Sequence, residues 1–245
     1  MKAILLDIEG TTTPVSFVFE VLFPFAREAV AGFLAAQGQE PEVQADLALL
    51  RQEYDGDGPS GPVSDHRTFA PASLPGWEGD APTAAVPYIH YLIKCDRKST
   101  GLKSLQGKLW DQGYGEGRLQ SQVFPDVKPA FQRWTAAGKR LYIFSSGSIQ
   151  AQKLLFAHTP EGDLTVYLSG YFDTTSGPKR EAASYRTITR AIAQPPSEIL
   201  FISDVVAELE AAQAAGLQTA FSYRPGNASA DSQGFRLIHS FDDLP

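Results

Sequence analysis

The sequence contains a single cysteine, Cys95, among its 245 residues. One thiol cannot form a disulfide within the chain, so no disulfide framework holds the fold together, and nothing in the composition requires an oxidising compartment. A lone thiol is also a poor basis for a zinc site or a catalytic nucleophile. We therefore expect Cys95 to pack as a small apolar residue that is buried or half-buried.

Positive charge and long apolar runs are scarce as well. The chain has 21 Lys and Arg against 28 Asp and Glu, which gives a net charge of -7 and a pI near 5.1. Such a charge repels nucleic acid and anionic membrane surfaces. The apolar run that starts at Ala3 is too short for a signal peptide or a membrane span. These absences predict a cytoplasmic protein that binds a small molecule, and neither nucleic acid nor a membrane.

Three short apolar runs have the pattern of strands that are covered on both faces of a parallel sheet. These runs are Ala3–Leu6, Arg140–Phe144 and Ile199–Ile202, and a last strand is expected near Thr219–Ser222, before a turn at Pro225 and Gly226. Helical patterns occupy 149–157 and 206–215, the second closed by Gly216, and another helix is expected from Pro129 to Gly138. The alternation predicts an α/β fold with a Rossmann-like, mostly parallel sheet.

The stretch between the first and second runs is too long for one crossover connection, and its apolar residues recur at helical spacing. The expected apolar helix faces carry Val21, Leu22, Phe25, Val30, Phe33 and Leu34, then Ile89, Leu92 and Ile93, then Leu102, Leu105, Leu109 and Trp110. Pro24 would start or kink the first of these helices. Five glycines and five prolines predict a long loop over 55–82. We predict an α/β catalytic core over 1–14 and 121–245 and an inserted helical cap domain over 15–120.

The first candidate site is DIEGTTT, Asp7–Thr13, directly after the first strand. Open α/β sheets bind ligands in the crevice at the carboxyl ends of their strands. Asp7 and Glu9 are two residues apart in an extended exit, so both carboxylates can face that crevice while Ile8 turns to apolar packing. Gly10 lets the chain turn. An isolated DxE of this kind is also compatible with a simple acidic turn.

Two further clusters supply groups that bind anions. Ser145, Ser146, Gly147 and Ser148 follow the second strand and open a helix, where hydroxyls and free backbone N–H groups form an anion site. Serines at this position also act as plain helix caps. Lys179, in GPK before a helix that starts near Glu181, offers a compact positive charge, although a single lysine is usually solvated.

Asp204 ends the third strand, and Glu208 follows one helical turn later on the same face. Asp204 taken alone reads as a helix cap. Carboxylates alone would repel a phosphate dianion, so a site built from all these residues needs a cation. Oxygen ligands without histidine or cysteine suit Mg²⁺ rather than zinc. The combination with Lys179 predicts Mg²⁺-dependent phosphate chemistry.

These clusters together resemble the four motifs of the haloacid dehalogenase superfamily, whose cap domain stands where the helical insert is expected. Longer blocks in insert and core resemble the enolase-phosphatases, or acireductone synthases, of methionine salvage. The blocks are DIEGTTTPVSFV, LFPFAR, CDRKSTGLKSLQGKLW, SSGSIQAQKLLFAHTPEGDL, YFDTTSGPKREAASYR and RPGNA. They span nearly the whole chain.

The resemblance implies a role for each candidate. Asp7 is the nucleophile and a metal ligand, Glu9 is the acid/base and a metal ligand, and Asp204 completes the Mg²⁺ site. The implied phosphate-binding residues are Ser145, Ser146 and Lys179. Most phosphatases of the superfamily carry aspartate where this chain has Glu9, so direct ligation by the longer side chain stays open. Glu208 would contact the metal ligands without binding the metal itself.

The implied reaction has two steps. A small phosphorylated diketone, 2,3-diketo-5-methylthiopentyl 1-phosphate, is enolised, and an aspartyl phosphate then forms and breaks down to release the acireductone and phosphate. No residue declares itself as the carbon base; His90, Lys98 and Lys103 are candidates, although each also suits a helix surface. The resemblance favours a monomer, while the apolar helix faces leave an interface open.

Three other readings share parts of this pattern. A dehalogenase needs the nucleophile but neither Glu9 nor a metal. A phosphomutase or general sugar phosphatase fits the core motifs and differs in the insert. A binding module that kept only the phosphate pocket would not need Asp7.

Overall fold

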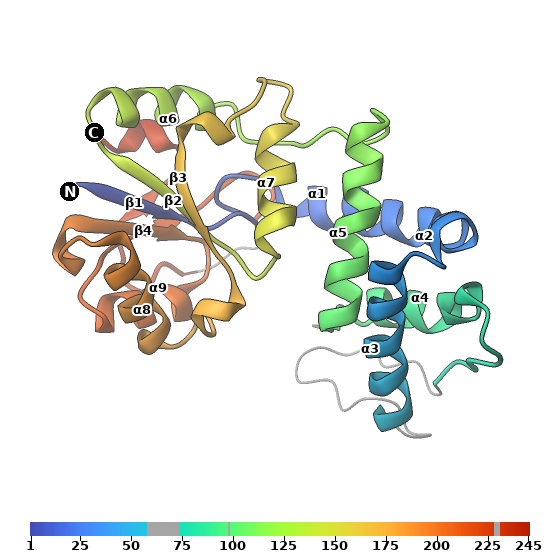
Figure 1. Cartoon of the computed structure of the whole chain (residues 1–245). Helices are drawn as coiled ribbons and strands as arrows, with labels where there is room; N and C mark the ends of the chain where they lie inside the picture. The colour runs from blue at the N-terminus through green and yellow to red at the C-terminus, as the bar shows by residue number, and fades with distance from the viewer. Residues whose placement is uncertain (58–73, 98, 228–230) are drawn as a thin grey trace. The chain divides into compact units, whose positions relative to one another are not determined.

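The computed structural model describes residues 1–57, 74–97, 99–227 and 231–245. They form two compact units: an α/β unit of Met1–Phe19 and Gly117–Pro245, and a helical unit of Glu20–Glu116 (Figure 1). The division predicted from the sequence, after residue 14 and before residue 121, differs from these bounds by a few residues at each junction. The short helix α1 (Val15–Phe17) belongs to the α/β unit.

The α/β unit is built on a parallel sheet in the order β3-β2-β1-β4-β5-β6. The strands are β1 (Ala3–Leu6), β2 (Arg140–Phe144), β3 (Leu168–Phe172), β4 (Ile199–Ser203), β5 (Gln218–Ser222) and β6 (Leu237–Ile238). The chain adds β2 and β3 on one side of β1 and then crosses to β4 on its other side. The strand order therefore reverses at β1 and β4, which is where sheets of this kind bind ligands. The predicted Rossmann-like α/β fold is confirmed.

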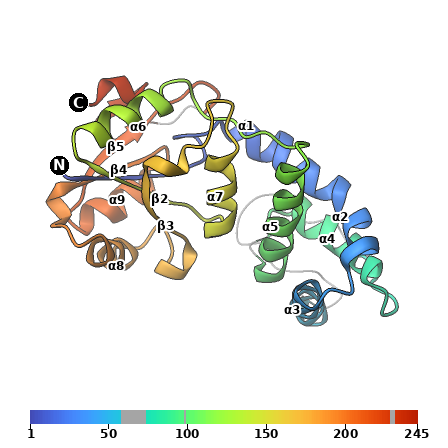
Figure 2. The same ribbon diagram turned by 45° about the horizontal axis from the view of Figure 1, so that its top comes forward.

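Helices cover both faces of this sheet (Figures 1 and 2). Alternate residues of β1 point to opposite faces, which explains why every one of them is apolar and buried. One face packs against α8 (Ala182–Ile192) and α9 (Val206–Ala214). The other is covered by α6 (Val127–Ala136) and α7 (Ile149–Ala157), whose Phe131 and Phe156 rings lie 6.1 Å apart.

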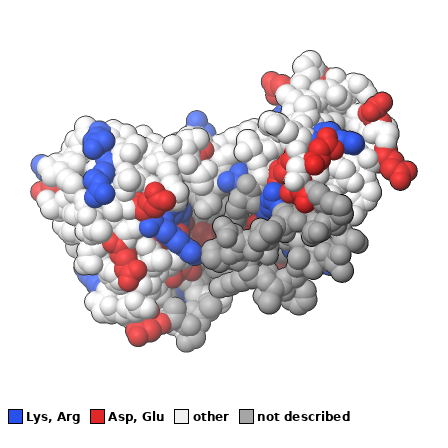
Figure 3. Space-filling model, turned by 90° about the horizontal axis from the view of Figure 1, so that it is seen from below, with Lys and Arg blue, Asp and Glu red and all other residues white. Residues whose placement is uncertain are grey.

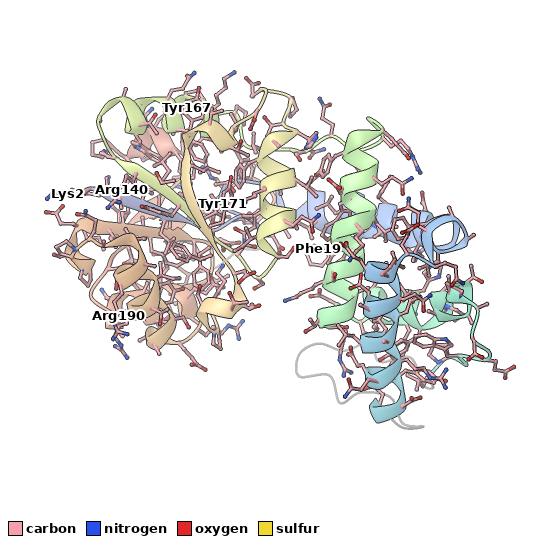
Figure 4. All side chains as sticks on the ribbon, viewed as in Figure 1. Lys2, Phe19, Arg140, Tyr167, Tyr171 and Arg190 are labelled. Atoms are coloured by element: carbon pink, nitrogen blue, oxygen red, sulfur yellow. The ribbon has the colours of Figure 1, made fainter. Side chains whose placement is uncertain are left out.

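The amino ends of the parallel strands lie at the end of the sheet away from the predicted site. There the Arg140 N–H donates to Lys2 O at 3.0 Å, and the two side chains lie near each other in Figure 4. The carboxyl ends lie at the opposite end of the sheet, and Asp7, Ser145 and Asp204 follow them.

The predicted elements of this unit were found with small differences. Helix α6 begins at Val127 rather than Pro129, because a proline in the first turn of a helix loses no hydrogen bond. Strand β3 was not predicted: it lies at the sheet edge, is only half-buried and contains Gly170, so it lacks a continuous apolar run. The strand near Thr219–Ser222 is not the last one, as was expected, because the two-residue strand β6 follows it at the other edge. The described residues of this unit also form 3₁₀ helices over Thr165–Tyr167, Thr174–Ser176, Pro196–Glu198 and Phe241–Asp243.

The helical unit contains α2 (Phe23–Gln37), α3 (Pro41–Asp57), α4 (Val86–Lys94) and α5 (Thr100–Gly115). A π-helix over Val18–Leu22 precedes α2, and a 3₁₀ turn over Pro82–Ala85 precedes α4. Pro24 lies in the first turn of α2, directly after the π-helix. None of the helices in the described part of the chain is both long and apolar enough to cross a bilayer.

Helix α3 was not predicted, although Val43, Leu47 and Leu50 are buried at helical spacing. It continues to Asp57, so the loop expected over 55–82 is wrong for its first residues; 58–73 lie outside the described residues. Cys95 follows α4 and is half-buried, as predicted, and burial raises the pKa of its thiol. A thiol of that kind is a weak nucleophile.

Candidate active site

The loop that leaves β1 is closed on itself by its backbone. Ile8 O accepts the N–H groups of Thr11, Thr12 and Thr13 at 3.2, 2.9 and 3.0 Å, and the Gly10 N–H donates to Thr13 O at 2.8 Å. Gly10 adopts φ +68°, a left-handed conformation that favours glycine. Ile8 is buried, as expected, and the tight loop fixes Asp7 at the carboxyl end of the central strand.

The Asp7 carboxylate is held by three donors from different parts of the chain. Its Oδ1 accepts the Ile8 N–H at 2.8 Å and lies 2.6 Å from Lys179 Nζ. Its Oδ2 lies 3.0 Å from Ser203 Oγ. Asp7 is buried, so these contacts fix the orientation of the carboxylate at the strand end.

Lys179 lies between two carboxylates, with its Nζ 2.6 Å from Asp7 Oδ1 and 2.6 Å from Glu208 Oε2. Burial alone would lower the pKa of this ammonium, but the two carboxylates outweigh it and hold the pKa above its usual value. The lysine is a permanent positive charge. Helix α8 holds its backbone, because the Tyr185 hydroxyl donates to Lys179 O at 2.7 Å and Ser184 Oγ donates to Pro178 O at 2.7 Å.

Ser203 and Glu208 complete this ion cluster. Ser203 Oγ lies 3.0 Å from both Asp7 Oδ2 and Glu208 Oε2, and its one hydroxyl proton can donate to either. Burial raises the pKa of Glu208, against the opposing effect of Lys179. Sequence reasoning placed Glu208 behind the ligands and missed Ser203, because a serine that ends an apolar strand resembles any cap.

Asp204 follows β4 beside the same cluster. Burial, together with the charges of Asp7 and Glu208, raises its pKa to about 7. The backbone of Gly10 stands directly against it, since a Cβ at Gly10 would lie 2.1 Å from Asp204 Oδ2. Only glycine fits at that position.

The predicted serines follow the neighbouring strand β2, which is paired with β1. Ser145 is buried and its Oγ accepts the Gly147 N–H at 3.1 Å, while Ser146 is exposed. Ser148 caps α7 through the Ala151 N–H at 3.2 Å. Ser148 is therefore the helix cap, and Ser146 is exposed in the loop between the end of β2 and α7.

Glu9 is exposed in the loop after β1, where its backbone forms an isolated bridge with Thr13. The candidates for the carbon base lie in the helical unit: His90 on α4, its Nε2 2.8 Å from Arg27 O, and Lys103 on α5. Lys98 lies outside the described residues.

The charges of the cluster fit a divalent cation. Asp7, Asp204 and Glu208 supply three carboxylates against the one ammonium of Lys179, which leaves two negative charges uncompensated when all are ionised. In the described ranges, no three acidic, histidine or cysteine side chains gather closely enough to hold a metal alone. Mg²⁺ commonly binds one or two carboxylates and takes its other ligands from water and substrate phosphate, so the donor set fits Mg²⁺.

Comparison with known proteins shows the family to which this chain belongs. The family model for haloacid dehalogenase-like hydrolases matches residues 1–216. The chain belongs to the haloacid dehalogenase-like hydrolases. Within these hydrolases it belongs to the enolase-phosphatase family, because it is 60% identical over 244 residues to the enolase-phosphatase E1 of Synechococcus elongatus, covering 100% of this chain and 98% of that protein.

Other enolase-phosphatases agree with this assignment. The protein of that name from Pseudomonas syringae pv. syringae is 48% identical, with 98% of this chain and 96% of that protein covered. A Vitis vinifera protein named as a probable bifunctional methylthioribulose-1-phosphate dehydratase/enolase-phosphatase is 48% identical, and this chain spans 47% of it. The resemblance predicted from the sequence is confirmed, and the relatives separate it from the dehalogenase and sugar-phosphatase alternatives.

Solved structures show the same fold. The UTR4 protein of Saccharomyces cerevisiae superimposes with a TM-score of 0.78 at 33% identity, covering 99% of each chain. CbbY of Rhodobacter sphaeroides, at 20% identity and a TM-score of 0.56, shares the fold of these hydrolases.

Proposed function

We infer that this chain is an enolase-phosphatase, an acireductone synthase of methionine salvage. It converts 2,3-diketo-5-methylthiopentyl 1-phosphate into 1,2-dihydroxy-3-keto-5-methylthiopentene and phosphate. The names of the relatives at 48–60% identity support this reaction. The structural observation that carries it is the buried Asp7 carboxylate, fixed by Lys179 and Ser203 at the end of the central strand.

The phosphatase half follows from the position of Asp7. A carboxylate oxygen of Asp7 attacks phosphorus, the bond from phosphorus to the enol oxygen breaks, and Glu9 supplies the proton to the leaving oxygen. Water then attacks the aspartyl phosphate, Glu9 takes the proton from that water, and Asp7 is released with free phosphate. Glu9 is exposed, so it can exchange protons with solvent between turnovers.

The remaining site residues bind and orient the phosphate in this proposal. Ser145 and Ser146 donate to its oxygens at the end of β2, and Lys179 offsets its charge from the side of Asp7. In the preceding enolisation a proton leaves C1 of the substrate and the C2 carbonyl oxygen gains one. Because Ser145, Ser146 and Lys179 hold the phosphate, the adjacent diketone is held at a fixed distance from the site residues.

We propose that Mg²⁺ is the cofactor, bound by Asp7 and Asp204, with Glu9 as the third candidate ligand. The fit rests on the uncompensated carboxylate charge and on the raised pKa of Asp204. When bound, Mg²⁺ supplies positive charge that stabilises the negative charge developing on phosphate and enolate oxygens.

The partners are part of the same proposal. On the face drawn in Figure 3, acidic and basic side chains are interspersed, and the net charge of -7 does not favour nucleic acid. We propose a small phosphorylated diketone as the ligand, a monomer as the working state and the cytoplasm as the location, the last because the chain has only one cysteine.

Turnover of the diketo phosphate with Mg²⁺, followed by the enediol absorbance and free phosphate together, tests the assignment. Asp7→Asn keeps the shape of the side chain but removes the nucleophile, so phosphate release should fall by several orders of magnitude. Asp242→Asn, which changes an exposed carboxylate of the same unit, is the matched control and should retain wild-type rates. Near-normal phosphate release by Asp7→Asn would show that another group attacks phosphorus.

A further inference from the structure

The segment that leaves β5, residues 222–227, contacts the loop that leaves β1, residues 7–13, which we call the Asp7 loop. It carries the RPGNA block, Arg224–Ala228, of which residues through Asn227 are described. The catalytic roles assigned above use none of these side chains. Their contacts nonetheless converge on two consecutive carbonyl groups of the Asp7 loop.

Three polar side chains of this segment donate to those carbonyls. Gly10 O accepts Asn227 Nδ2 at 2.9 Å and Ser222 Oγ at 3.2 Å. Thr11 O accepts Arg224 Nε at 3.1 Å. Since the N–H groups of the loop are used within the loop, these donors satisfy carbonyls that would otherwise be buried without partners.

Arg224 makes this attachment rigid. Its guanidinium lies 4.9 Å from the centre of the Phe124 ring and 4.3 Å from that of Phe241, and its Nη1 is 2.7 Å from Asp126 Oδ2. The arginine is buried. The exit of β5 is therefore anchored in the core of the α/β unit, and Asn227 reaches Gly10 from a fixed base.

Gly10 links this anchor to the proposed metal ligands. It is three residues from Asp7, and its Cα stands so close to Asp204 that a Cβ would lie 2.1 Å from the Asp204 Oδ2. Any shift of the Gly10 peptide therefore changes the space in which the Asp204 carboxylate sits. Metal–ligand distances tolerate only about 0.2 Å of change, so a small shift is enough to weaken binding.

We propose that Asn227 is a positioning residue for the metal site. By holding the Gly10 carbonyl, it keeps the Asp7 loop against Asp204, so that the two carboxylates stand at the separation that a divalent cation requires. The proposal rests on the function proposed above, in which Asp7 and Asp204 bind Mg²⁺. Ser222 supports the same carbonyl, and Arg224 anchors the segment.

Calorimetric titration of the whole protein with Mg²⁺ tests this role without relying on activity. Asn227→Ala should raise the Mg²⁺ dissociation constant about tenfold, as loss of supporting residues behind metal ligands commonly does. Gln218→Ala is the matched control: it removes an amide-to-carbonyl hydrogen bond, to Ser197 O at 2.6 Å, at the other end of the same strand. The control should bind Mg²⁺ as the wild type does.

Three results would overturn the proposal. Unchanged Mg²⁺ affinity in Asn227→Ala, with the wild type binding normally, would leave Asn227 a structural residue only. Equal weakening by Gln218→Ala would show a general loss of stability. If the wild type itself binds no Mg²⁺, the metal assignment fails, and this proposal fails with it.

A second variant keeps the proposal testable if Asn227→Ala does not fold. Ser222→Ala removes the other hydrogen bond to Gly10 O and should also weaken Mg²⁺ binding, by a smaller factor. If Ser222→Ala then bound Mg²⁺ with wild-type affinity, the idea that the Gly10 carbonyl positions the metal site would be refuted.

Discussion

Replacing Lys179 by methionine should strongly destabilise the metal-free protein. The ammonium lies 2.6 Å from a carboxylate oxygen of Asp7 and 2.6 Å from one of Glu208, and all three side chains are at most 10% exposed. Removing one partner of a buried ion pair costs about 3–5 kcal/mol, because the remaining charges are left uncompensated. Methionine has nearly the length and volume of lysine, so little of the loss comes from a cavity.

The assay is urea unfolding at pH 8 with a chelator, in which the midpoint is compared at unchanged slope. Lys128→Met is the matched control, because Lys128 pairs with Glu161 at 3.8 Å while the two side chains are 32% and 54% exposed. An exposed pair of this kind contributes about 0–1 kcal/mol. The Lys179→Met loss should shrink as the pH falls, since burial raises the pKa of Glu208 and protonation removes one of the opposing charges.

Equal midpoints for Lys179→Met and Lys128→Met would refute the reasoning. That outcome would mean that Asp7 and Glu208 do not depend on the ammonium, and that water or another cation compensates them in solution. A loss that stayed constant between pH 8 and pH 6 would also contradict it, because protonation of the carboxylates must relieve their repulsion.

Three further predictions concern the strand ends at which Asp7 and Asp204 lie. The metal-free protein should be more stable at pH 6 than at pH 8, because the pKa of Asp204 is raised to about 7. Between about pH 4 and pH 7 the folded state holds a proton that the unfolded chain releases. This contribution to stability is lost as the pH rises through 7. Stabilisation by Mg²⁺ should show the reverse trend, growing from pH 6 to pH 8 in thermal melts, and a trend of the same sign as that of the metal-free protein would contradict the assignment of Asp204. Gly10→Ala should abolish Mg²⁺ binding in calorimetry and cost about 1–3 kcal/mol of stability, because its φ is +68° and its Cβ would overlap Asp204. Normal Mg²⁺ affinity in that variant would show that Asp204 does not bind the metal.

Much of the fold could be predicted from local patterns. β1 and β2 matched their predicted bounds, and so did α7, because a continuous apolar run or a helical period reflects burial that neighbouring residues share. The edge strand β3 escaped prediction because it is only half-buried, and α3 because its apolar residues are few. Both depend on what packs against them.

The site divides in the same way. Local sequence pattern was enough to predict which chemical groups stand at the strand ends, since Asp7, Ser145 and Asp204 each come after a short apolar run typical of a buried strand. The contacts that these groups make with residues far away in the sequence could be known only from the folded chain. Ser203 meets Asp7 across 196 positions of sequence, and Asn227 meets Gly10 across 217. Such contacts depend on the order of the strands, which places β4 beside β1 and β5 beyond it, and no local pattern of residues encodes that order.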